Sequence, residues 1–190
     1  MFRPLPAHLA DDQNEICNRL DPKKDVDSMN HLSNAGVYEG RADLGYAPCT
    51  AQACMEILDY YNIDLKGKNV CVVGHSLVVG RPAALLALNR DATTTQCHIM
   101  TRNTPEHTQK ADVIIVACGK AGLVTEKWLG EGQIVIDVGI NVTAEGKIVG
   151  DVDKAAAEAK TAAYSPVPGG VGAVTTSVLM KHVVEAAEKV

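Results

Sequence analysis

Short apolar runs alternate with longer segments of helical spacing from about residue 47 onward. Four runs rich in Val, Ile and Thr are each only a few residues long and fall at residues 69–73, 93–98, 113–117 and 134–138. Runs of this length without polar alternation are typical of strands that are buried on both faces of a sheet. The pattern therefore predicts four parallel strands.

The segments between and around these runs have the spacing of amphipathic helices. Apolar residues share one face over residues 51–61, with Thr50 as the expected N-cap, and helices are also predicted at 82–88 and at Trp128 and Leu129. Residues 155–163 are expected to form either a helix or a small alanine-rich linker. Alternation of strands and helices indicates crossover connections of a single hand. We therefore expect an α/β, Rossmann-like, mostly parallel sheet with helices on both faces.

Crossovers of one hand bring the carboxyl ends of all the strands to one edge, where open α/β sheets bind ligands. The turns expected at that edge are rich in glycine or hydroxyl groups and span residues 74–80, 98–101, 118–122 and 139–143. The topology and the candidate chemistry thus point to the same edge.

The two ends of the chain have a different pattern. Residues 1–46 are polar and weakly periodic, apart from a short helix expected before Asp21 and Pro22. The tail contains a Pro- and Gly-rich loop at 165–172 and a final helix, with Thr175 as its expected cap. Both ends carry apolar positions with no evident covering surface, and we interpret them as remnants of a second α/β domain.

Composition narrows the possible functions. Apolar residues make up 46% of the 190 residues and aromatic residues 4%, which fits a core of small aliphatic side chains. The formal net charge is -5 and no basic patch is present, so nucleic acid is not an expected partner. No bilayer-spanning run or signal peptide is evident, and the six cysteines have neither CxxC nor zinc spacing. We expect a soluble cytoplasmic protein with no metal site and with buried, reduced cysteines.

The turn after the first predicted strand is the strongest chemical candidate. Gly74 permits a tight turn, Ser76 offers a hydroxyl, and Gly80 allows a ligand to approach the backbone closely. A helix N-terminus directed at this turn favours a pyrophosphate. The spacing is not GxGxxG, so the residues alone leave two interpretations open: a phosphate-binding loop or an ordinary turn between a strand and a helix.

Residues 74–82 read Gly-His-Ser-Leu-Val-Val-Gly-Arg-Pro. This loop resembles the G-x-S-x-x-V-G-x-P signature of the bifunctional methylenetetrahydrofolate dehydrogenase/cyclohydrolase family. Four further segments resemble that family in the same order, namely Asp-Pro-Lys-Lys-Asp-Val-Asp at 21–27, Pro-Cys-Thr at 48–50, Asp-Val-Gly-Ile-Asn at 137–141 with Gly-Asp-Val at 150–152, and Pro-Val-Pro-Gly-Gly-Val-Gly at 166–172. The resemblance covers nearly the whole chain.

The resemblance implies NAD(P)-dependent oxidation of 5,10-methylenetetrahydrofolate, followed by hydrolysis of the methenyl product to 10-formyltetrahydrofolate. It assigns cofactor binding to Gly74, His75, Ser76, Gly80, Ile99 and Ile140, with Ile99 at the adenosine end and Ile140 beside the nicotinamide. It assigns the pterin contact to Asp27 and the folate-pocket loop to Pro168, Gly169 and Gly170. Tetrahydrofolate derivatives are the partners that it implies.

Departures from the family pattern are as informative as the matches. The 190 residues contain no Tyr-x-x-x-Lys motif, whose lysine is the family's general acid/base. Phe2 stands where the family has a catalytic glutamine, Ser28 where it has glycine after Asp27, and Ala173 where it has proline after Gly172. We therefore expect the cyclohydrolase step to be lost in this chain alone.

The expected organisation follows from these departures. Residues 1–46 are predicted to be a remnant of the folate-binding catalytic domain, 47–160 the NAD(P)-binding domain, and 161–190 a folate-pocket loop and helix that return to the first domain. Such a chain is expected to form a homodimer or a complex with a chain that supplies the missing domain. The alternative is a non-catalytic dinucleotide- or folate-binding module, or one subunit of a split enzyme.

Cofactor choice is left open between NADP and NAD. NADP-using relatives often carry Arg at the position of His75 and Ser or Arg at that of Ile99, where they hold the 2′-phosphate. His75 binds phosphate when it is protonated, and Ile99 offers no donor. Arg102 is close in sequence and could replace these groups. A weakened preference for NADP is expected.

Overall fold

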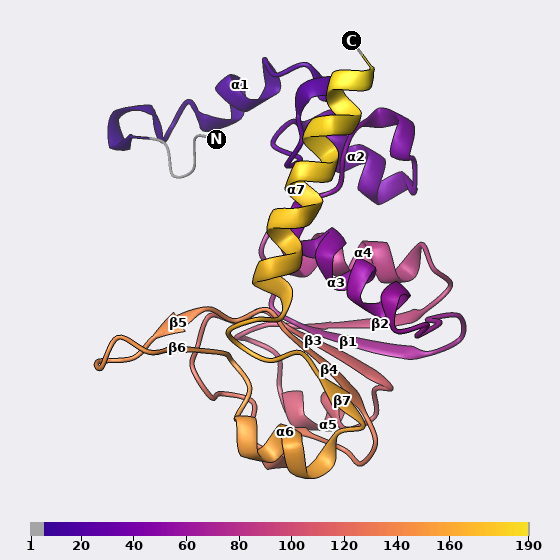
Figure 1. Ribbon diagram of the computed structural model, residues 1–190, viewed down its shortest axis with the longest axis vertical. Helices are drawn as coiled ribbons and strands as arrows, with labels where there is room; N and C mark the ends of the chain where they lie inside the picture. The colour runs from indigo at the N-terminus through magenta and orange to yellow at the C-terminus, as the bar shows by residue number, and fades with distance from the viewer. Residues whose placement is uncertain (1–5, 190) are drawn as a thin grey trace.

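The computed structural model describes residues 6–189, and its centre is a five-stranded parallel sheet (Figure 1). The strands lie in the order β2-β1-β3-β4-β7 and are β1 (Asn69–Val73), β2 (Thr93–Cys97), β3 (Val113–Val116), β4 (Ile134–Asp137) and β7 (Ala163–Tyr164). The four strands expected from sequence are confirmed within one residue. The strand order changes direction between β1 and β3, which places a ligand-binding crevice at the carboxyl ends of these two strands.

Helices cover both faces of this sheet, as the sequence predicts. One face packs against α3 (Cys49–Tyr60), α4 (Gly80–Leu88) and α7 (Val171–Glu188), and the other against α5 (Thr104–Thr108), α6 (Lys154–Lys160) and the 3₁₀ helix η4 (Glu126–Trp128) (Figure 1). Alternate residues of β3 enter the two cores, with Ile115 in the first and Ile114 in the second. The central strands are apolar throughout because both of their faces are buried.

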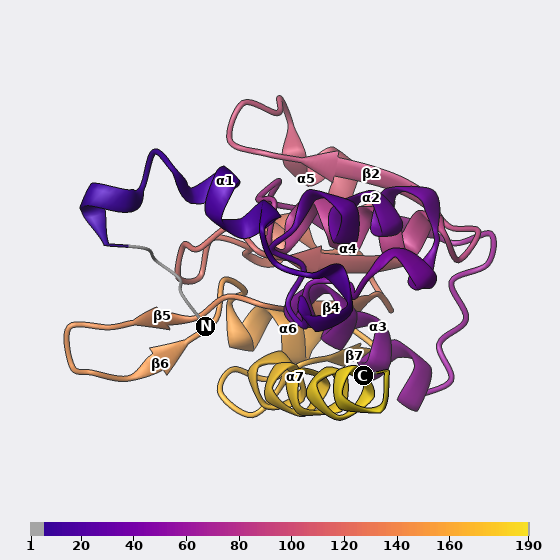
Figure 2. The ribbon, with the colours of Figure 1, turned by 90° about the horizontal axis from the view of Figure 1, so that it is seen from above.

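Three further features were not predicted from the sequence. A two-stranded antiparallel hairpin, β5 (Asn141–Val142) and β6 (Ile148–Val149), projects from the body of the protein (Figure 2). Strand β7 adds only two residues to the sheet, and α5 is a single short helix. Elements of this length carry too few residues for a hydrophobic period to stand out.

The described part of the N-terminal region, residues 6–46, contains helices and turns but no strand. Its elements are η1 (Ala7–Leu9), α1 (Gln13–Asn18), η2 (Pro22–Lys24), α2 (His31–Glu39) and η3 (Ala42–Leu44). The second half of α7 extends from the sheet to this region (Figure 1). Within residues 6–189, no helix combines the length and apolarity required to cross a bilayer.

Two predicted caps are wrong. Helix α3 begins at Cys49, before Thr50, because the Asp27 carboxylate accepts a hydrogen bond from the Cys49 amide and so caps the helix from a distant segment. Helix α7 begins at Val171, and Thr175 lies inside it, where its hydroxyl donates to the Val171 carbonyl. A cap supplied by tertiary structure, or a start at a buried residue, leaves no local sequence signal.

Candidate functional site at the carboxyl edge of the sheet

The loop between β1 and α4 crosses the end of β3, and two glycines make this possible. Gly74 has a φ of +123°, and a Cβ built there would overlap the Ala117 carbonyl oxygen. A Cβ at Gly80 would overlap the carbonyl oxygen of Gly74 itself. The loop therefore folds tightly onto the sheet at the point where the strand order reverses, and both glycines are required by contact.

Side chains from three directions hold this loop. The Ser76 hydroxyl oxygen accepts hydrogen bonds from the amides of Val79 (3.1 Å) and Gly80 (3.3 Å). The Arg81 guanidinium donates to the His75 carbonyl at 3.1 Å, and the Gln96 side chain donates to that of Gly74 at 3.1 Å. The Ser76 hydroxyl thus shapes the turn at the start of α4.

The backbone amides of the same loop fit an anionic ligand. Within residues 6–189, the N–H groups of residues 75–78 donate no hydrogen bond, while those of Val79 and Gly80 are used by Ser76. Consecutive free amides at the start of a helix form an arrangement that binds phosphate. The geometry therefore favours the phosphate-binding interpretation of this loop over that of an ordinary turn.

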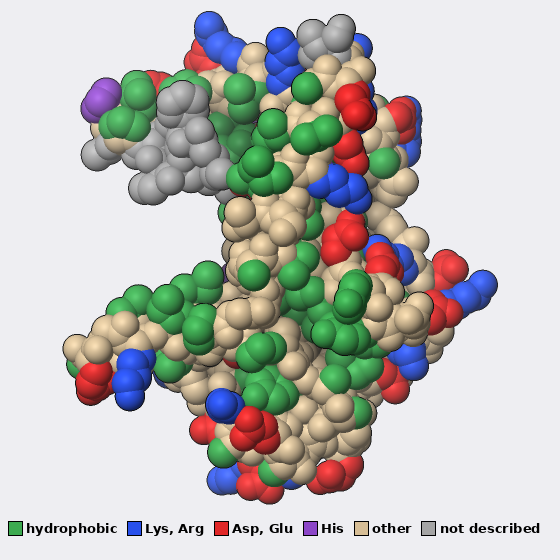
Figure 3. All heavy atoms as spheres, viewed as in Figure 1, with side chains coloured by type: hydrophobic (Ala, Val, Ile, Leu, Met, Phe, Trp, Pro, Cys, Tyr) green, Lys and Arg blue, Asp and Glu red, His purple; other side chains and the backbone are tan. Residues whose placement is uncertain are grey.

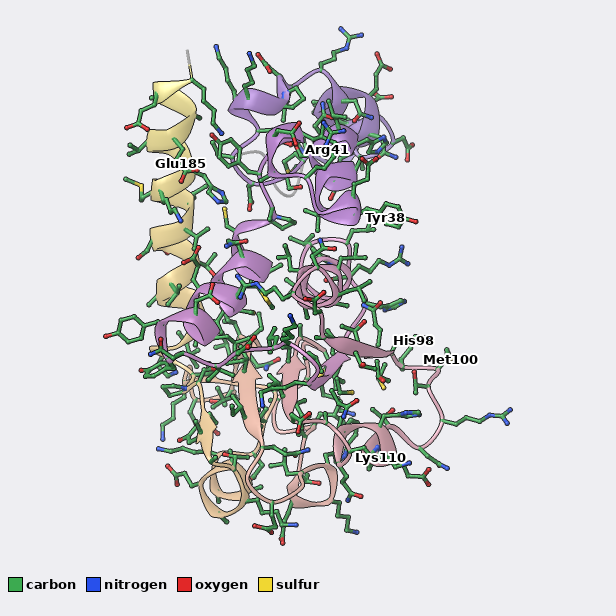
Figure 4. All side chains as sticks on the ribbon, turned by 90° about the vertical axis from the view of Figure 1, so that its right-hand side faces the viewer. Tyr38, Arg41, His98, Met100, Lys110 and Glu185 are labelled. Atoms are coloured by element: carbon green, nitrogen blue, oxygen red, sulfur yellow. The ribbon has the colours of Figure 1, made fainter. Side chains whose placement is uncertain are left out.

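The segment after β2 lies beside this loop. The His75 and His98 rings stack with their centroids 4.8 Å apart, and the Thr101 hydroxyl accepts a hydrogen bond from the His98 amide at 2.9 Å. Ile99 is 95% exposed and Met100 is 79% exposed. Figure 4 shows His98 and Met100 on the opposite side of the molecule from α7. The structure thus brings the segment that carries Ile99 to the Gly74 loop, while Ile99 itself faces solvent.

A shallow pocket of about 180 Å³ lies farther along the edge, between the end of β4 and the start of α7. Ile140 lines this pocket together with Pro168, Gly169 and Gly170. The residue expected beside the nicotinamide and the loop expected at the folate therefore lie in the same pocket. Figure 3 shows a hollow above the hairpin β5–β6, with hydrophobic side chains along that hairpin. The pocket is predominantly apolar, which suits a flat ring system.

Asp27 lies apart from this pocket. Its carboxylate is half-buried and accepts the Cys49 amide at 3.0 Å. The neighbouring Val26 carbonyl lies 2.9 Å from Nδ1 of His182, a residue of α7. Since Val171 lines the pocket, His182 is about three turns farther along α7, roughly 16 Å at 1.5 Å per residue. In the described chain, no hydrogen bond joins Asp27 to the pocket.

Two buried carboxylates organise the edge between these groups, and neither was assigned a role from sequence. Asp151 is fully buried and accepts hydrogen bonds from the amides of Cys118, Gly119 and Lys120 at 2.7–2.8 Å. Asp137 accepts the amides of Gly139, Asp151 and Val152, and burial raises the pKa of its carboxyl group. Together they tie the loop after β3 to the loop after β4.

A sequence signal for these residues was available. Each acid ends or follows an apolar run and has a glycine within two residues. In the structure each of these glycines lies against the other acid, because a Cβ at Gly139 would overlap Asp151 and one at Gly150 would overlap Asp137. Burial, and secondarily Asp151, raises the pKa of the adjacent Cys118 to about 12, so this thiol is protonated at neutral pH. The expectation that the cysteines are mostly buried is confirmed, since five of the six are buried and Cys118 is partly buried.

Comparisons with known proteins are consistent with this geometry. Residues 48–190 match the sequence profile of the tetrahydrofolate dehydrogenase/cyclohydrolase NAD(P)-binding domain. A bifunctional protein FolD of Clostridium botulinum is 48% identical over 189 residues. That alignment covers 100% of this chain and 66% of the relative, so the chain spans slightly less than two thirds of the relative's length.

Solved structures show the same likeness. The bifunctional FolD enzyme of Campylobacter jejuni superposes with a TM-score of 0.90 at 40% identity, covering 94% of this chain and 63% of that one. The Trypanosoma brucei FolD structure, complexed with NADP cofactor and inhibitor, gives a TM-score of 0.88 at 34% identity, with coverages of 98% and 65%. The chain therefore belongs to the tetrahydrofolate dehydrogenase/cyclohydrolase family and contains its NAD(P)-binding domain.

Proposed function

We propose that this chain binds NADP or NAD at the carboxyl edge of its sheet and serves the oxidation of 5,10-methylenetetrahydrofolate to the 5,10-methenyl form. The observation that carries the proposal is the Gly74 loop, whose amides at residues 75–78 donate to no group in the described chain and so can bind a pyrophosphate. Family membership selects the folate substrate among the many that use such a loop. A bound nicotinamide would accept the hydride removed from that substrate.

Residues at the carboxyl edge of the sheet have different roles in this proposed function. The amides of His75 and Ser76 bind the cofactor phosphates, while Gly74 and Gly80 give the loop its shape. Ile140 and the loop at Pro168–Gly170 form an apolar wall that excludes water from the reacting rings. Ile99, exposed after β2, offers an apolar surface to the adenosine end. Asp27 is proposed to accept hydrogen bonds from the pterin.

The proposed domain division remains 1–46, 47–160 and 161–190, with α7 joining the last segment to the first. Helix α7 presents the exposed side chains of Met180, Val183 and Val184. These apolar positions support the proposal that the working form is a homodimer or a complex with a chain that supplies a further domain. A cytoplasmic location also remains a prediction.

We propose that a polypeptide of these 190 residues does not hydrolyse methenyltetrahydrofolate, since it contains no Tyr-x-x-x-Lys. Lys120 lies in the loop after β3, where Asp151 accepts a hydrogen bond from its amide. Within residues 6–189, its side chain makes no hydrogen bond or ion pair that would orient it as a general acid/base. The second candidate function is a non-catalytic binding module or one subunit of a split enzyme, and the shape of the Gly74 loop suits it equally. The two candidates share cofactor binding and differ in whether the chain oxidises substrate.

The test is calorimetry with NADP and NAD, followed by assays of methylenetetrahydrofolate oxidation and methenyltetrahydrofolate hydrolysis. We expect binding of at least one dinucleotide, and hydrolysis at the buffer rate. Gly74→Ala should abolish binding, because its Cβ overlaps Ala117. Gly132→Ala is the matched control, since Gly132 also has positive φ (+72°) but has open space around it. Folded protein that binds neither dinucleotide would overturn the proposal, and binding without oxidation would favour the non-catalytic module.

A further inference from the structure

One buried carboxylate binds both the loop that follows β3 and the segment that follows β4. Asp151 is completely buried, and its carboxylate accepts the backbone amides of residues 118–120 at 2.7–2.8 Å. It also accepts the side-chain amide of Asn141, the first residue of β5, at 2.8 Å. A buried carboxylate requires such hydrogen bonds, and here they come from two separate segments of the carboxyl edge.

Ile140, which lines the pocket, is flanked by two residues that lie against this carboxylate. Gly139 approaches so closely that a Cβ there would overlap Asp151, and Asn141 donates to it. The end of the Ile140 side chain lies 3.9 Å from the position that a Cβ of Gly172 would occupy in the first turn of α7. The place of Ile140 in the pocket wall is therefore set by the Asp151 carboxylate on the backbone side and by α7 on the side-chain side.

The loop after β3 carries the same restraint to the Gly74 loop. The Ala117 carbonyl oxygen lies where a Cβ of Gly74 would stand, so the two loops are in backbone contact. Residues 118–120, which follow directly, are those whose amides Asp151 binds. A continuous series of contacts thus runs from the Gly74 loop through Asp151 to Ile140.

This series of contacts joins the two points at which the proposed function places a dinucleotide. The phosphates are proposed to bind the Gly74 loop, and the nicotinamide the pocket wall at Ile140. The covalent structure of the cofactor fixes the separation of these two groups. A wall that is already held at that separation binds the second group without a cost of ordering, whereas a loose wall has to be ordered on binding.

We propose that Asp151 and Asn141 form a positioning pair, which holds the Ile140 wall at a fixed separation from the Gly74 loop and so lets the nicotinamide end add to the affinity that the phosphates supply. Asp151 is completely buried, so it acts through the residues that it binds. This inference rests on the proposed dinucleotide binding and adds the residues that make its two halves work together.

The test compares each dinucleotide with the fragment that lacks only nicotinamide, which is ADP-ribose for NAD and 2′-phospho-ADP-ribose for NADP. Calorimetry is done on the 190-residue chain and on Asn141→Leu, which keeps the size of the side chain but removes the donor to Asp151. We expect dinucleotide affinity to fall by about tenfold, the lower end of what a hydrogen bond to a charged group contributes. Affinity for the fragments should stay unchanged, because they bind the Gly74 loop without the pocket wall.

NMR gives a readout that a general loss of stability would not produce. On addition of the dinucleotide, the Ile140 Cδ1 methyl resonance should shift in the original chain and shift less in Asn141→Leu. The amide resonances of residues 75–78 should shift equally in both proteins. Asn141→Gln, which retains a side-chain N–H donor, should recover part of the lost affinity.

Two further variants complete the design. Val142→Ala is the matched control, because Val142 follows Asn141 on β5, is 70% exposed and does not line the pocket. It should change neither dinucleotide nor fragment affinity. Asp151→Asn places an N–H donor against amides that need an acceptor, so its effect should exceed that of Asn141→Leu. Asn141→Leu keeps the test decisive where Asp151→Asn does not fold.

The outcomes are distinguishable. An equal loss of affinity for dinucleotide and fragment in Asn141→Leu would overturn this proposal, because it would show that Asn141 stabilises the whole edge. Unchanged dinucleotide affinity in that variant would also overturn it. Equal affinity of the original chain for dinucleotide and fragment would do the same, while phosphate binding at the Gly74 loop would stand. Folded protein that binds neither dinucleotide would overturn the proposed function and this proposal with it.

Discussion

The sheet region and the N-terminal region are stabilised in different ways. In the sheet region, all four residues of β3 are completely buried and apolar. In residues 6–46, buried polar side chains (Asp25, Ser28, Asn30 and Ser33) stand beside a smaller apolar set, Cys17, Val37 and Tyr46. The first region is held by removal of apolar surface from water, the second by hydrogen bonds that replace those to water.

Asp25 is the centre of the polar region. Its carboxylate, 2% exposed, accepts the amides of Met29 and Asn30 at 2.7 Å and the Ser33 hydroxyl at 2.7 Å. The links from this region to the sheet region are mainly hydrogen bonds, such as those of Asp27 with the Cys49 amide, Val26 with His182, and the Val37 carbonyl with the Asn89 side chain. A region with few buried apolar contacts opens more readily than a core, so the wall that carries Asp27 should be the less stable part of the site.

The largest effect is expected from Ile115→Ala, in the core of the sheet region. Ile115 is completely buried in the core formed by α3, α4 and α7. Removing its side chain leaves a cavity and should cost about 4 kcal/mol of unfolding free energy. Urea unfolding should show the loss in the sheet and in the N-terminal region alike, because the latter depends on α3 and α7.

The matched control for this prediction is Ile148→Ala on the hairpin β5–β6. Ile148 is 46% exposed, so its removal should change the unfolding free energy by less than about 1 kcal/mol. Ile115→Ala could instead unfold the sheet region while the α2 amides keep their protection from hydrogen exchange. That result would show that the N-terminal region folds independently of α3 and α7, contrary to this prediction.

The sheet region could be predicted from sequence because its signals are local. Runs such as Val113–Val116 are apolar at every position, and Gly74 marks the end of β1. The N-terminal region has no such signal. The hydrogen bonds of Asp25 and Asn30 join residues that no periodic pattern relates, and the cap that Asp27 gives to α3 crosses from one region to the other. Phe2, where a catalytic glutamine was expected, lies outside the described residues.

In the candidate site, too, some residues could be predicted from sequence and others could not. The glycines of the Gly74 loop and of the loop at Pro168–Gly170 were identified because backbone geometry demands glycine, which a motif records. Asp137 and Asp151 were overlooked because their partners are backbone amides, which have no sequence identity. The stack of His75 on His98 depends on the register of β1 and β2 and could not be predicted from spacing.

A smaller and local effect is expected from Asp25→Ala. The variant leaves two buried amides and one hydroxyl without their acceptor, which should cost about 3 kcal/mol. Hydrogen exchange should accelerate in α2 and around Met29 while β3 keeps its protection. Asp11→Ala, at an exposed position, is the control and should leave both regions unchanged. Equal acceleration in α2 and β3 would show that the two regions unfold as one unit.

The smallest effect, and the only stabilising one, is expected from Ser28→Gly. Ser28 has a φ of +56°, the left-handed region that favours glycine, and it stands where the family pattern has glycine. Glycine relieves this backbone strain but gives the unfolded chain more conformational entropy. The net effect should stabilise the N-terminal region by about 0.5 kcal/mol. Ser28→Ala, which keeps the strain and loses the 3.5 Å contact between the hydroxyl and Asn34, should be slightly less stable than the original chain. Hydrogen-exchange rates of the α2 amides measure the change in stability for each of the two variants. If the glycine and alanine variants exchange at the same rate, the hydroxyl matters more than the strain, and Ser28 is a further member of the polar network that distinguishes this region from the sheet.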